Sequence, residues 1–432
     1  MLVAEGSTFS VHTSLLFDPK SKSFQSDISL VIDSKSGLVK STIRRSEPLS
    51  EHIAPPDVDL RGKTVLPGLV DAHTHIFLHA YSETPSLNQM RDESFVERVI
   101  RATIHCRKAL MAGYTTYRDL GTEGAFDADI DLRNAINRGL IPGPRLYVAT
   151  QTIASSGGYA IRQENALGGT VVPPIADYAD GVDGVRAAVR RRLGVGADIV
   201  KFYADYRKRT LRFPPSQWPG AEPIDYIPAG EPKNHLLFNQ EEMNEIVREA
   251  TAAECPVAAH AGSSKAVSMA AKAGVRTIEH GNEADDDALK AMADAKTIFV
   301  PTLATMEIFL PRNGSFEKVL AQTLKAWKLG IPLAAGGDTG AFPHGENVRE
   351  LELMLEAGIP LEEVLTSATL IGWEACGGEW CGRQFGWLAP GCSADVIALS
   401  GDIREDHSAL RKVEFVMKGG RVWKLDGKPI VD

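Results

Sequence analysis

The sequence lacks the features that mark membrane-spanning and disulfide-stabilised proteins. No window approaches about 18 uninterrupted apolar residues, so we expect no membrane-spanning helix. The first residues show no basic segment followed by an apolar one, so we expect no signal peptide. The five cysteines are few for 432 residues and odd in number, which predicts free thiols in a reducing cytoplasm.

An excess of positive charge and an internal repeat are also missing. The formal net charge is −9, which argues against a nucleic-acid-binding face because such a face needs clustered Lys and Arg. No period recurs along the chain, which argues against a solenoid or a propeller. The composition is that of an ordinary globular protein, and we expect neither nucleic acid nor membrane as a partner.

Short apolar runs alternate with amphipathic stretches through most of the chain. Eight strands alternating with helices are typical of an α/β protein built as a (β/α)8 TIM-like barrel. The expected strands are Thr64–Val70, Thr115–Leu120, Arg145–Thr150, Asp198–Tyr203, Pro256–His260, Thr277–His280, Thr297–Pro301 and Pro332–Gly336. Further helices are expected at Glu346–Ala357 and Leu361–Cys376.

The two chain ends carry strands of another kind. Residues 1–63 hold short alternating runs separated by turn signals, and this segment is too short to bury a core alone. Near the other end, strands surround the Gly419-Gly420 pair, which is typical of a two-residue hairpin turn. We therefore predict one small β-sandwich built from residues 1–63 plus 383–432, with the barrel of residues 64–382 inserted between its halves.

The first barrel strand leads into two histidines. His73 and His75 are two positions apart, so both side chains point to the same side of an extended strand. Two imidazoles that converge on one point suit a transition metal. Taken alone, such a pair is also compatible with a solvated strand end.

The ends of other predicted strands carry the same kind of chemistry. Lys201 lies in the fourth strand, His260 and His280 end the fifth and sixth, and Asp338 follows the eighth. The carboxyl ends of barrel strands meet at one face, where active sites are found. Each residue alone has a structural explanation, such as a helix cap for Asp338, but together they predict a metal site.

These motifs resemble the amidohydrolase superfamily. The resemblance rests on Leu66-Pro-Gly-Leu-Val-Asp-Ala-His-Thr-His75, Val200-Lys201, Ala259-His260, Ile278-Glu-His280-Gly, Gly337-Asp338-Thr and Leu388-Ala-Pro-Gly-Cys-Ser-Ala-Asp395. It is similar in particular to the imidazolonepropionase-like branch, which includes prolidases, metal-dependent carboxypeptidases and ochratoxinase-type amidases. Nearly the whole chain is covered.

The resemblance implies a binuclear centre of two divalent cations, with zinc as the default. His73 and His75 would hold one ion together with Asp338, and His260 and His280 would hold the second. Lys201 would be N-carboxylated and would bridge both, because a free ammonium has no acceptor to offer a metal. A hydroxide shared by the metals would attack the carbonyl, with Asp338 as general base and then acid.

The same comparison narrows the reaction to hydrolysis of an amide C–N bond. Single-metal deaminases lack the strand lysine and place a Glu shortly after the fifth-strand histidine, whereas His260 is followed by Ala-Gly-Ser-Ser-Lys. The expected substrates are N-acyl amino acids, dipeptides or related small amides. The alternatives are a cyclic amide or lactone, and a non-catalytic scaffold of the dihydropyrimidinase-related kind. Relatives are often oligomers, so a homo-oligomer is expected.

The substrate pocket is less well defined by the sequence. Long connections at residues 151–182 and 204–239 follow the third and fourth strands, where loops build substrate pockets. Tyr203 and Arg207 are candidates for binding a substrate carboxylate, although a solvated basic loop explains them equally well. His344 is a candidate for proton transfer or substrate contact.

Overall fold

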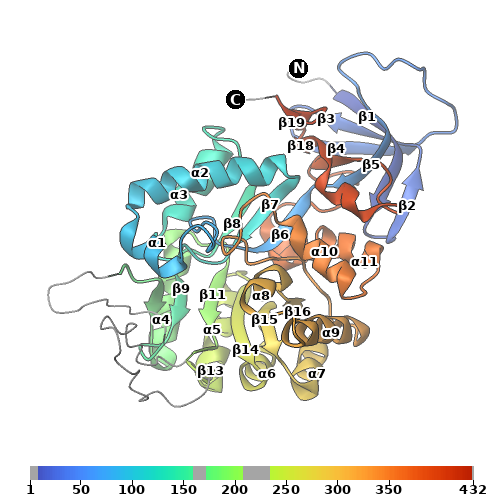
Figure 1. Cartoon of the computed structure of the whole chain (residues 1–432). Helices are drawn as coiled ribbons and strands as arrows, with labels where there is room; N and C mark the ends of the chain where they lie inside the picture. The colour runs from blue at the N-terminus through green and yellow to red at the C-terminus, as the bar shows by residue number, and fades with distance from the viewer. Residues whose placement is uncertain (1–7, 159–171, 208–233, 431–432) are drawn as a thin grey trace, which may run out of the picture.

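The computed structural model describes residues 8–158, 172–207 and 234–430. Figure 1 shows two regions, with both chain ends beside a β-layer at the top and with parallel strands flanked by helices below it. The fold is therefore of the expected α/β class.

Nine strands from both chain ends form the β-layer. Its order is β20-β19-β18-β17-β5-β1-β3-β4, with β2 on β1. The expected pairing of the two ends is present where β17 runs antiparallel to β5, with Ile397 opposite Leu66. The strands are β1 (Thr8–Asp18), β2 (Ser23–Ser26), β3 (Ile28–Asp33), β4 (Leu38–Arg44), β5 (Val58–Pro67), β17 (Val396–Ser400), β18 (Val413–Lys418), β19 (Arg421–Leu425) and β20 (Lys428–Pro429).

The predicted hairpin at Gly419-Gly420 is confirmed. It joins β18 to β19, with Lys418 opposite Arg421. Both glycines have positive φ values, 56° and 74°. This backbone matches the twist of the flanking strands and is disfavoured for residues with a side chain.

Nine strands of the lower region run parallel. They form two groups, β6-β7-β8 and β10-β9-β11-β14-β15-β16. Hydrogen bonds from Asp198 and Ile199 to the Val148 carbonyl connect the groups beside β8 and β11. The strands are β6 (Leu69–Thr74), β7 (Tyr114–Asp119), β8 (Arg145–Val148), β9 (Thr152–Ala154), β10 (Ala176–Tyr178), β11 (Val200–Tyr203), β14 (Val257–Ser263), β15 (Thr277–Glu283) and β16 (Ile298–Val300).

Two predicted strands differ from the structure. The run Thr64–Val70 is divided at Gly68, so that its first part belongs to β5 and its second to β6. The segment Pro332–Gly336 is not a continuous strand and forms one isolated bridge, between Leu333 and Phe299. Pro332 has no N–H to donate, and proline interrupts strand ladders for this reason. The segment still bonds on both sides, since Phe299 donates to Pro332 and Ala72 donates to Ala335.

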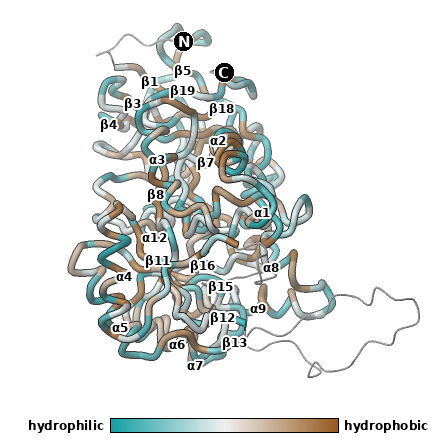
Figure 2. The backbone as a smooth tube through the Cα atoms, turned by 90° about the vertical axis from the view of Figure 1, so that its left-hand side faces the viewer, coloured by the Kyte–Doolittle hydropathy of each residue, from teal (hydrophilic) through white to brown (hydrophobic). Residues whose placement is uncertain are grey.

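Helices flank the parallel strands and turn their apolar sides inward. In α5, Met243, Ile246 and Ala250 are buried at helical spacing, and Figure 2 shows hydrophilic stretches along the outer parts of α4 and α5. The longer helices are α2 (Phe95–Met111), α3 (Ala128–Asn137), α4 (Gly181–Val195), α5 (Gln240–Ala252), α6 (Ser264–Ala273), α7 (Asp286–Ala295), α9 (Ser315–Lys328) and α10 (Val348–Glu356). The shorter ones are α1 (Ser86–Asp92), α8 (Leu303–Phe309), α11 (Leu361–Ser367) and α12 (Leu370–Ala375).

The prediction of a single helix at Leu361–Cys376 is wrong, because the structure has two helices there, α11 and α12. Thr369 has a non-helical backbone, with φ −135° and ψ −92°. Its hydroxyl donates to the carbonyl of Leu365. A threonine hydroxyl that bonds the preceding turn offers the chain an alternative to the helix, which explains the break here.

The two long connections lie partly outside the described residues. The part of 151–182 that is described contains β9 and β10. In 204–239, the described ends contain β12 (Asp205–Arg207) and β13 (Asn234–Leu236), which pair antiparallel. Residues 159–171 and 208–233 are not described. In the described parts of the chain, no helix has the length and apolar character that crossing a bilayer requires.

Gly336 provides a test of the close contact between β6 and the segment after β16. A Cβ at this position would lie 2.7 Å from the backbone nitrogen of His73. We expect Gly336→Ala to lower the free energy of unfolding by about 2 kcal/mol, because a clash with backbone atoms cannot be relieved by rotating a side chain. Gly194→Ala is the control, since nothing lies within 4 Å there and the position is helical. Thermal unfolding measures both, and equal effects would contradict the packing argument.

Candidate metal centre and active site

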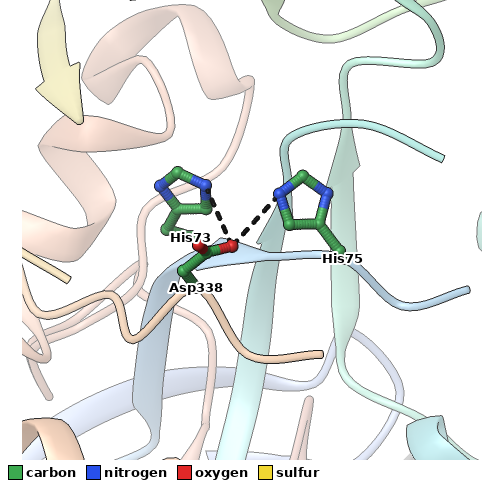
Figure 3. A group of neighbouring side chains, drawn as sticks. All are labelled: His73, His75 and Asp338. Atoms are coloured by element: carbon green, nitrogen blue, oxygen red, sulfur yellow. Dashed lines mark ion pairs between the residues drawn. The ribbon is translucent and has the colours of Figure 1, made fainter. Parts of the chain in front are cut away.

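The first histidine pair converges on Asp338. His73 lies near the carboxyl end of β6, and His75 follows two residues later, just after the strand. Their Nε2 atoms lie 3.5 Å and 3.2 Å from Asp338 Oδ1 (Figure 3). One ligand atom from each of the three side chains lies within 4.8 Å of the others, a spacing that a metal ion can bridge.

The second histidine pair lies beside the first. His260 on β14 and His280 on β15 come from neighbouring parallel strands, and their ring centroids are 4.5 Å apart. The centroids of His280 and His73 are 5.0 Å apart. The structure therefore gathers all four predicted histidines and Asp338 into one cluster at the carboxyl ends of the strands.

Lys201 lies within electrostatic range of this cluster. It is on β11, where it pairs with Ala258 two residues before His260. Its side chain is buried, and Nζ has no hydrogen-bond partner among the described residues. Burial lowers the Lys201 pKa to about 8. Burial and the charge of Lys201 together lower the pKa of His73 well below its usual value.

The second ring nitrogen of three histidines is held by the surrounding protein. His73 Nδ1 lies 2.9 Å from Glu279 Oε2, His75 Nδ1 donates to the Gly121 carbonyl at 2.8 Å, and His280 Nδ1 lies 2.9 Å from Thr302 Oγ1. In metal sites such bonds fix the ring and leave the other nitrogen for the ion. The cluster thus has the supporting contacts that metal-binding histidines require.

Burial and neighbouring charges set the protonation of the cluster. Burial lowers the pKa of His280 to about 4, so its ring is neutral at pH 7, which is the form that binds metals. Burial also disfavours charge on His75, but the hydrogen bond and charge of Asp338 raise its pKa to about 9. Burial opposes the ionisation of Asp338, yet His73 and His75 hold its pKa below the usual value. A cation between these groups would replace the proton that His75 shares with Asp338.

Two residues of the cluster have a strained backbone. His280 has φ 73° and Asp338 has φ 60°, in the left-handed region that residues with a side chain rarely adopt. Such conformations cost on the order of 1–3 kcal/mol and concentrate at functional sites. Next to Asp338, the Thr339 hydroxyl donates to Asp71 at 2.8 Å, and Asn347 also donates to Asp71 at 2.6 Å. These buried bonds hold the Asp338 turn against β6.

The three predicted substrate contacts lie in different surroundings. Tyr203 is buried, its ring centroid lies 5.0 Å from that of His260, and its hydroxyl donates to Glu123 at 3.3 Å. Arg207 is exposed at the end of β12, just before residues that are not described. The structure does not bring His344 into the cluster.

His344 instead packs behind the chain that follows His75. Its ring stacks on His105 at 4.3 Å, and its Nε2 donates to the Leu78 carbonyl at 3.1 Å. His105 in turn contacts the Ile76 carbonyl at 2.9 Å. The geometry therefore gives this pair a supporting contact with residues 76–78.

Sequence reasoning gave no role to Arg118 and Glu279. Both side chains are fully buried, and their closest atoms are 2.8 Å apart. Glu279 is the residue that also contacts His73. The available signal was a charged residue inside each of two predicted strands, since Arg118 lies within Thr115–Leu120 and Glu279 lies within Thr277–His280.

Comparison with known proteins agrees with this geometry. The profile of the amidohydrolase family matches residues 64–423. The chain belongs to the amidohydrolase family. It is 31% identical to the ochratoxinase of Aspergillus niger over 400 residues, which cover 85% of this chain and 77% of that protein.

Several solved structures match nearly the whole chain. A Xaa-Pro dipeptidase with methionine bound in its active site has a TM-score of 0.78 and 31% identity, over 97% of this chain and 100% of the other. A prolidase in complex with N-methylphosphonate-L-proline has a TM-score of 0.77 and 27% identity, with coverage of 97% and 100%. This amidohydrolase is therefore a metal-dependent hydrolase of amide bonds, as the sequence predicted.

The ion pair between Glu279 and Arg118 should carry a large share of the stability of the site. We expect Glu279→Gln to lower the free energy of unfolding by about 3 kcal/mol, because Arg118 would be left as an uncompensated buried charge. Chemical denaturation measures the change. The control is Glu363→Gln, whose partner Lys22 is about half exposed, and which should cost less than about 1 kcal/mol. Similar losses in both variants would contradict this interpretation.

Proposed function

We propose that this amidohydrolase uses two divalent cations to cleave the amide bond of an N-acyl amino acid, a dipeptide or a related small amide. The observation that carries the proposal is the gathering of four imidazoles, Asp338 and a buried lysine without a hydrogen-bond partner in the described residues. The similarity to a Xaa-Pro dipeptidase and to a prolidase supports a dipeptide-like substrate.

The environment of Lys201 fits a carboxylated side chain. Its Nζ lies among histidines that a cation would also need, and an ammonium there would repel the cation. Reaction with CO2 would turn it into an anionic ligand with two oxygens. The lowered pKa favours this reaction, because the neutral amine is the form that reacts. The carbamate would bridge the two ions.

The remaining ligands divide into two sets by their contacts. His73, His75 and Asp338 would hold one ion, and His260 and His280 would hold the other. Zinc suits a set of imidazoles with carboxylate-type oxygens. Bound there, the cations would supply Lewis-acid activation of water and of the substrate carbonyl.

Asp338 would move the proton in this reaction. Its pKa is held below the usual value, so it is ionised at neutral pH and can accept a proton from the attacking water. It would then donate that proton to the leaving nitrogen. The exposed guanidinium of Arg207 would bind the carboxylate of the leaving amino acid, by a bidentate pair.

The fold proposed for this function is a closed barrel of residues 64–382, inserted in a β-sandwich of residues 1–63 and 383–432. Support comes from hydrogen bonds that continue around the parallel strands, where the Asp198 N–H donates to the Val148 carbonyl. On the other side, the Phe299 N–H donates to Pro332 and the Ala72 N–H donates to Ala335. A cytoplasmic location is also part of the proposal. The five cysteines are all free, as a reducing compartment requires.

We further propose that the chain forms homo-oligomers. On α2, Phe95, Val96, Ile100 and Ile104 are exposed on adjoining turns, and such apolar faces mark protein contacts. We expect light scattering to give a mass of at least two chains, and Ile100→Glu to reduce it. A monomer at micromolar concentration in the wild type would contradict this proposal.

The metal content and the activity together test the proposed function. We expect about two zinc or similar ions per chain by plasma mass spectrometry, with a sharp fall in Lys201→Ala. Hydrolysis of dipeptides and N-acyl amino acids should fall at least about a thousandfold in this variant, as expected for loss of a metal centre. Lys265→Ala, a change on helix α6, is the control.

Three outcomes would contradict the proposal. A single ion, unaffected by Lys201→Ala, would exclude the bridging carbamate. Turnover of lactones or cyclic amides, without turnover of linear amides, would move the reaction to the alternative class. Absence of bound metal would favour a non-catalytic scaffold.

A further inference from the structure

A buried carboxylate beside the histidine cluster has no part in the reaction described so far. Glu123 follows β7 and is 7% exposed. Its carboxylate accepts a hydrogen bond from the Tyr203 hydroxyl at 3.3 Å. Its φ is 50°, in the strained left-handed region. Glu123 thus sits in the wall formed by the ends of β7 and β11.

The backbone of Glu123 is fixed by a buried arginine. Arg98 on α2 donates to the carbonyl oxygens of Thr122 and Glu123, at 3.1 Å and 2.8 Å. The guanidinium therefore binds the backbone and not the carboxylate. Among the described residues, no Lys, Arg or His side chain is within ion-pair distance of the Glu123 carboxylate.

Tyr203 connects Glu123 to the histidine cluster. Its hydroxyl donates to the Glu123 carboxylate, and its ring centroid lies 5.0 Å from that of His260. Burial, with the charges of Asp338 and Glu123, also raises the pKa of the nearby Tyr81 well above its usual value. A buried carboxylate that is bonded by a neutral hydroxyl is stabilised further when a cationic group lies against it.

We propose that Glu123 and Tyr203 form a subsite for a cationic amino group on the acyl portion of the substrate. This inference rests on the proposed function and deepens it, because it selects dipeptides with a free amino end over N-acylated amino acids. An N-acyl substrate would bring no cationic group to form an ion pair with the buried carboxylate. Sites built around a polar partner reject ligands that lack it.

Charge also sets the orientation of such a substrate. A dipeptide carries an ammonium at one end and a carboxylate at the other. Glu123 repels the carboxylate end, whereas the exposed Arg207 attracts it. The acyl portion therefore lies by Glu123 and the leaving amino acid lies toward β12.

A matched pair of ligands isolates the ammonium group. L-Methioninamide and 4-(methylthio)butanamide share the same chain and differ only in the α-amino group. Calorimetric titration of the metal-loaded enzyme should show that the amine binds about tenfold to a hundredfold more tightly, as for buried charge pairs. Glu123→Gln should remove this preference, and Glu123→Asp, which keeps the charge, should retain part of it.

The control variant is Glu245→Gln. Glu245 is also a buried glutamate, but its partners Arg186 and Arg248 lie on the outer helices. This variant should keep the wild-type preference for the amine. A wild type without preference, or a Glu123→Gln variant that weakens both ligands equally, would overturn the proposal. The wild-type measurement alone decides the matter if Glu123→Gln does not fold.

Turnover separates this inference from the proposed function. The ratio of kcat/KM for methionyl-proline to that for N-acetyl-methionyl-proline should fall about tenfold or more in Glu123→Gln. If no amide is hydrolysed by the wild type, the proposed function fails, while the binding preference still tests the subsite. If both substrates are hydrolysed with an unchanged ratio, the subsite fails and the proposed function stands.

Discussion

The buried guanidinium of Arg118 is the contact on which the rest of the site depends. It donates to the Ala72 carbonyl at 2.5 Å, to the Thr277 hydroxyl at 2.8 Å and to Glu279 at 2.8 Å. Glu279 in turn contacts His73 at 2.9 Å. The Arg118 guanidinium thus connects β6 to β15 and, through Glu279, fixes the orientation of the His73 ring. Because a buried charge is stable only when fully partnered, these groups form a single unit.

Hydrogen bonds from the surrounding protein also orient other histidines of the cluster. Three of the four imidazoles have an oxygen bonded at Nδ1, such as the Gly121 carbonyl for His75 and the Thr302 hydroxyl for His280. Burial keeps His260 and His280 neutral, so the nitrogens that face the centre remain free for a cation. The Lys201 amine has no hydrogen-bond partner among the described residues, and the Glu123 carboxylate has a neutral one, the Tyr203 hydroxyl. The two proposals about chemistry arise from these two groups.

Local sequence rules predicted the parts of the site that lie at strand ends. His73 and His75 converge because side chains alternate along an extended strand, and His260 and His280 adjoin because β14 and β15 are neighbours. The same rules were weaker where turns decide the geometry. The segment Pro332–Gly336 forms hydrogen bonds on both sides without being a strand. The helix predicted at Leu361–Cys376 is interrupted at Thr369. Periodicity does not report such interruptions, since they depend on individual hydroxyl and proline contacts.

The sequence by itself determined the α/β class, the family motifs and the identity of the candidate ligands, because strand period and residue chemistry are local properties. Only the tertiary structure decided how distant residues meet. It brought Arg118 to Glu279, placed Glu123 beside Tyr203, and moved His344 away from the cluster to stack on His105. The physical reason is that burial and partner choice depend on neighbours that are far away in the chain, which no local pattern records.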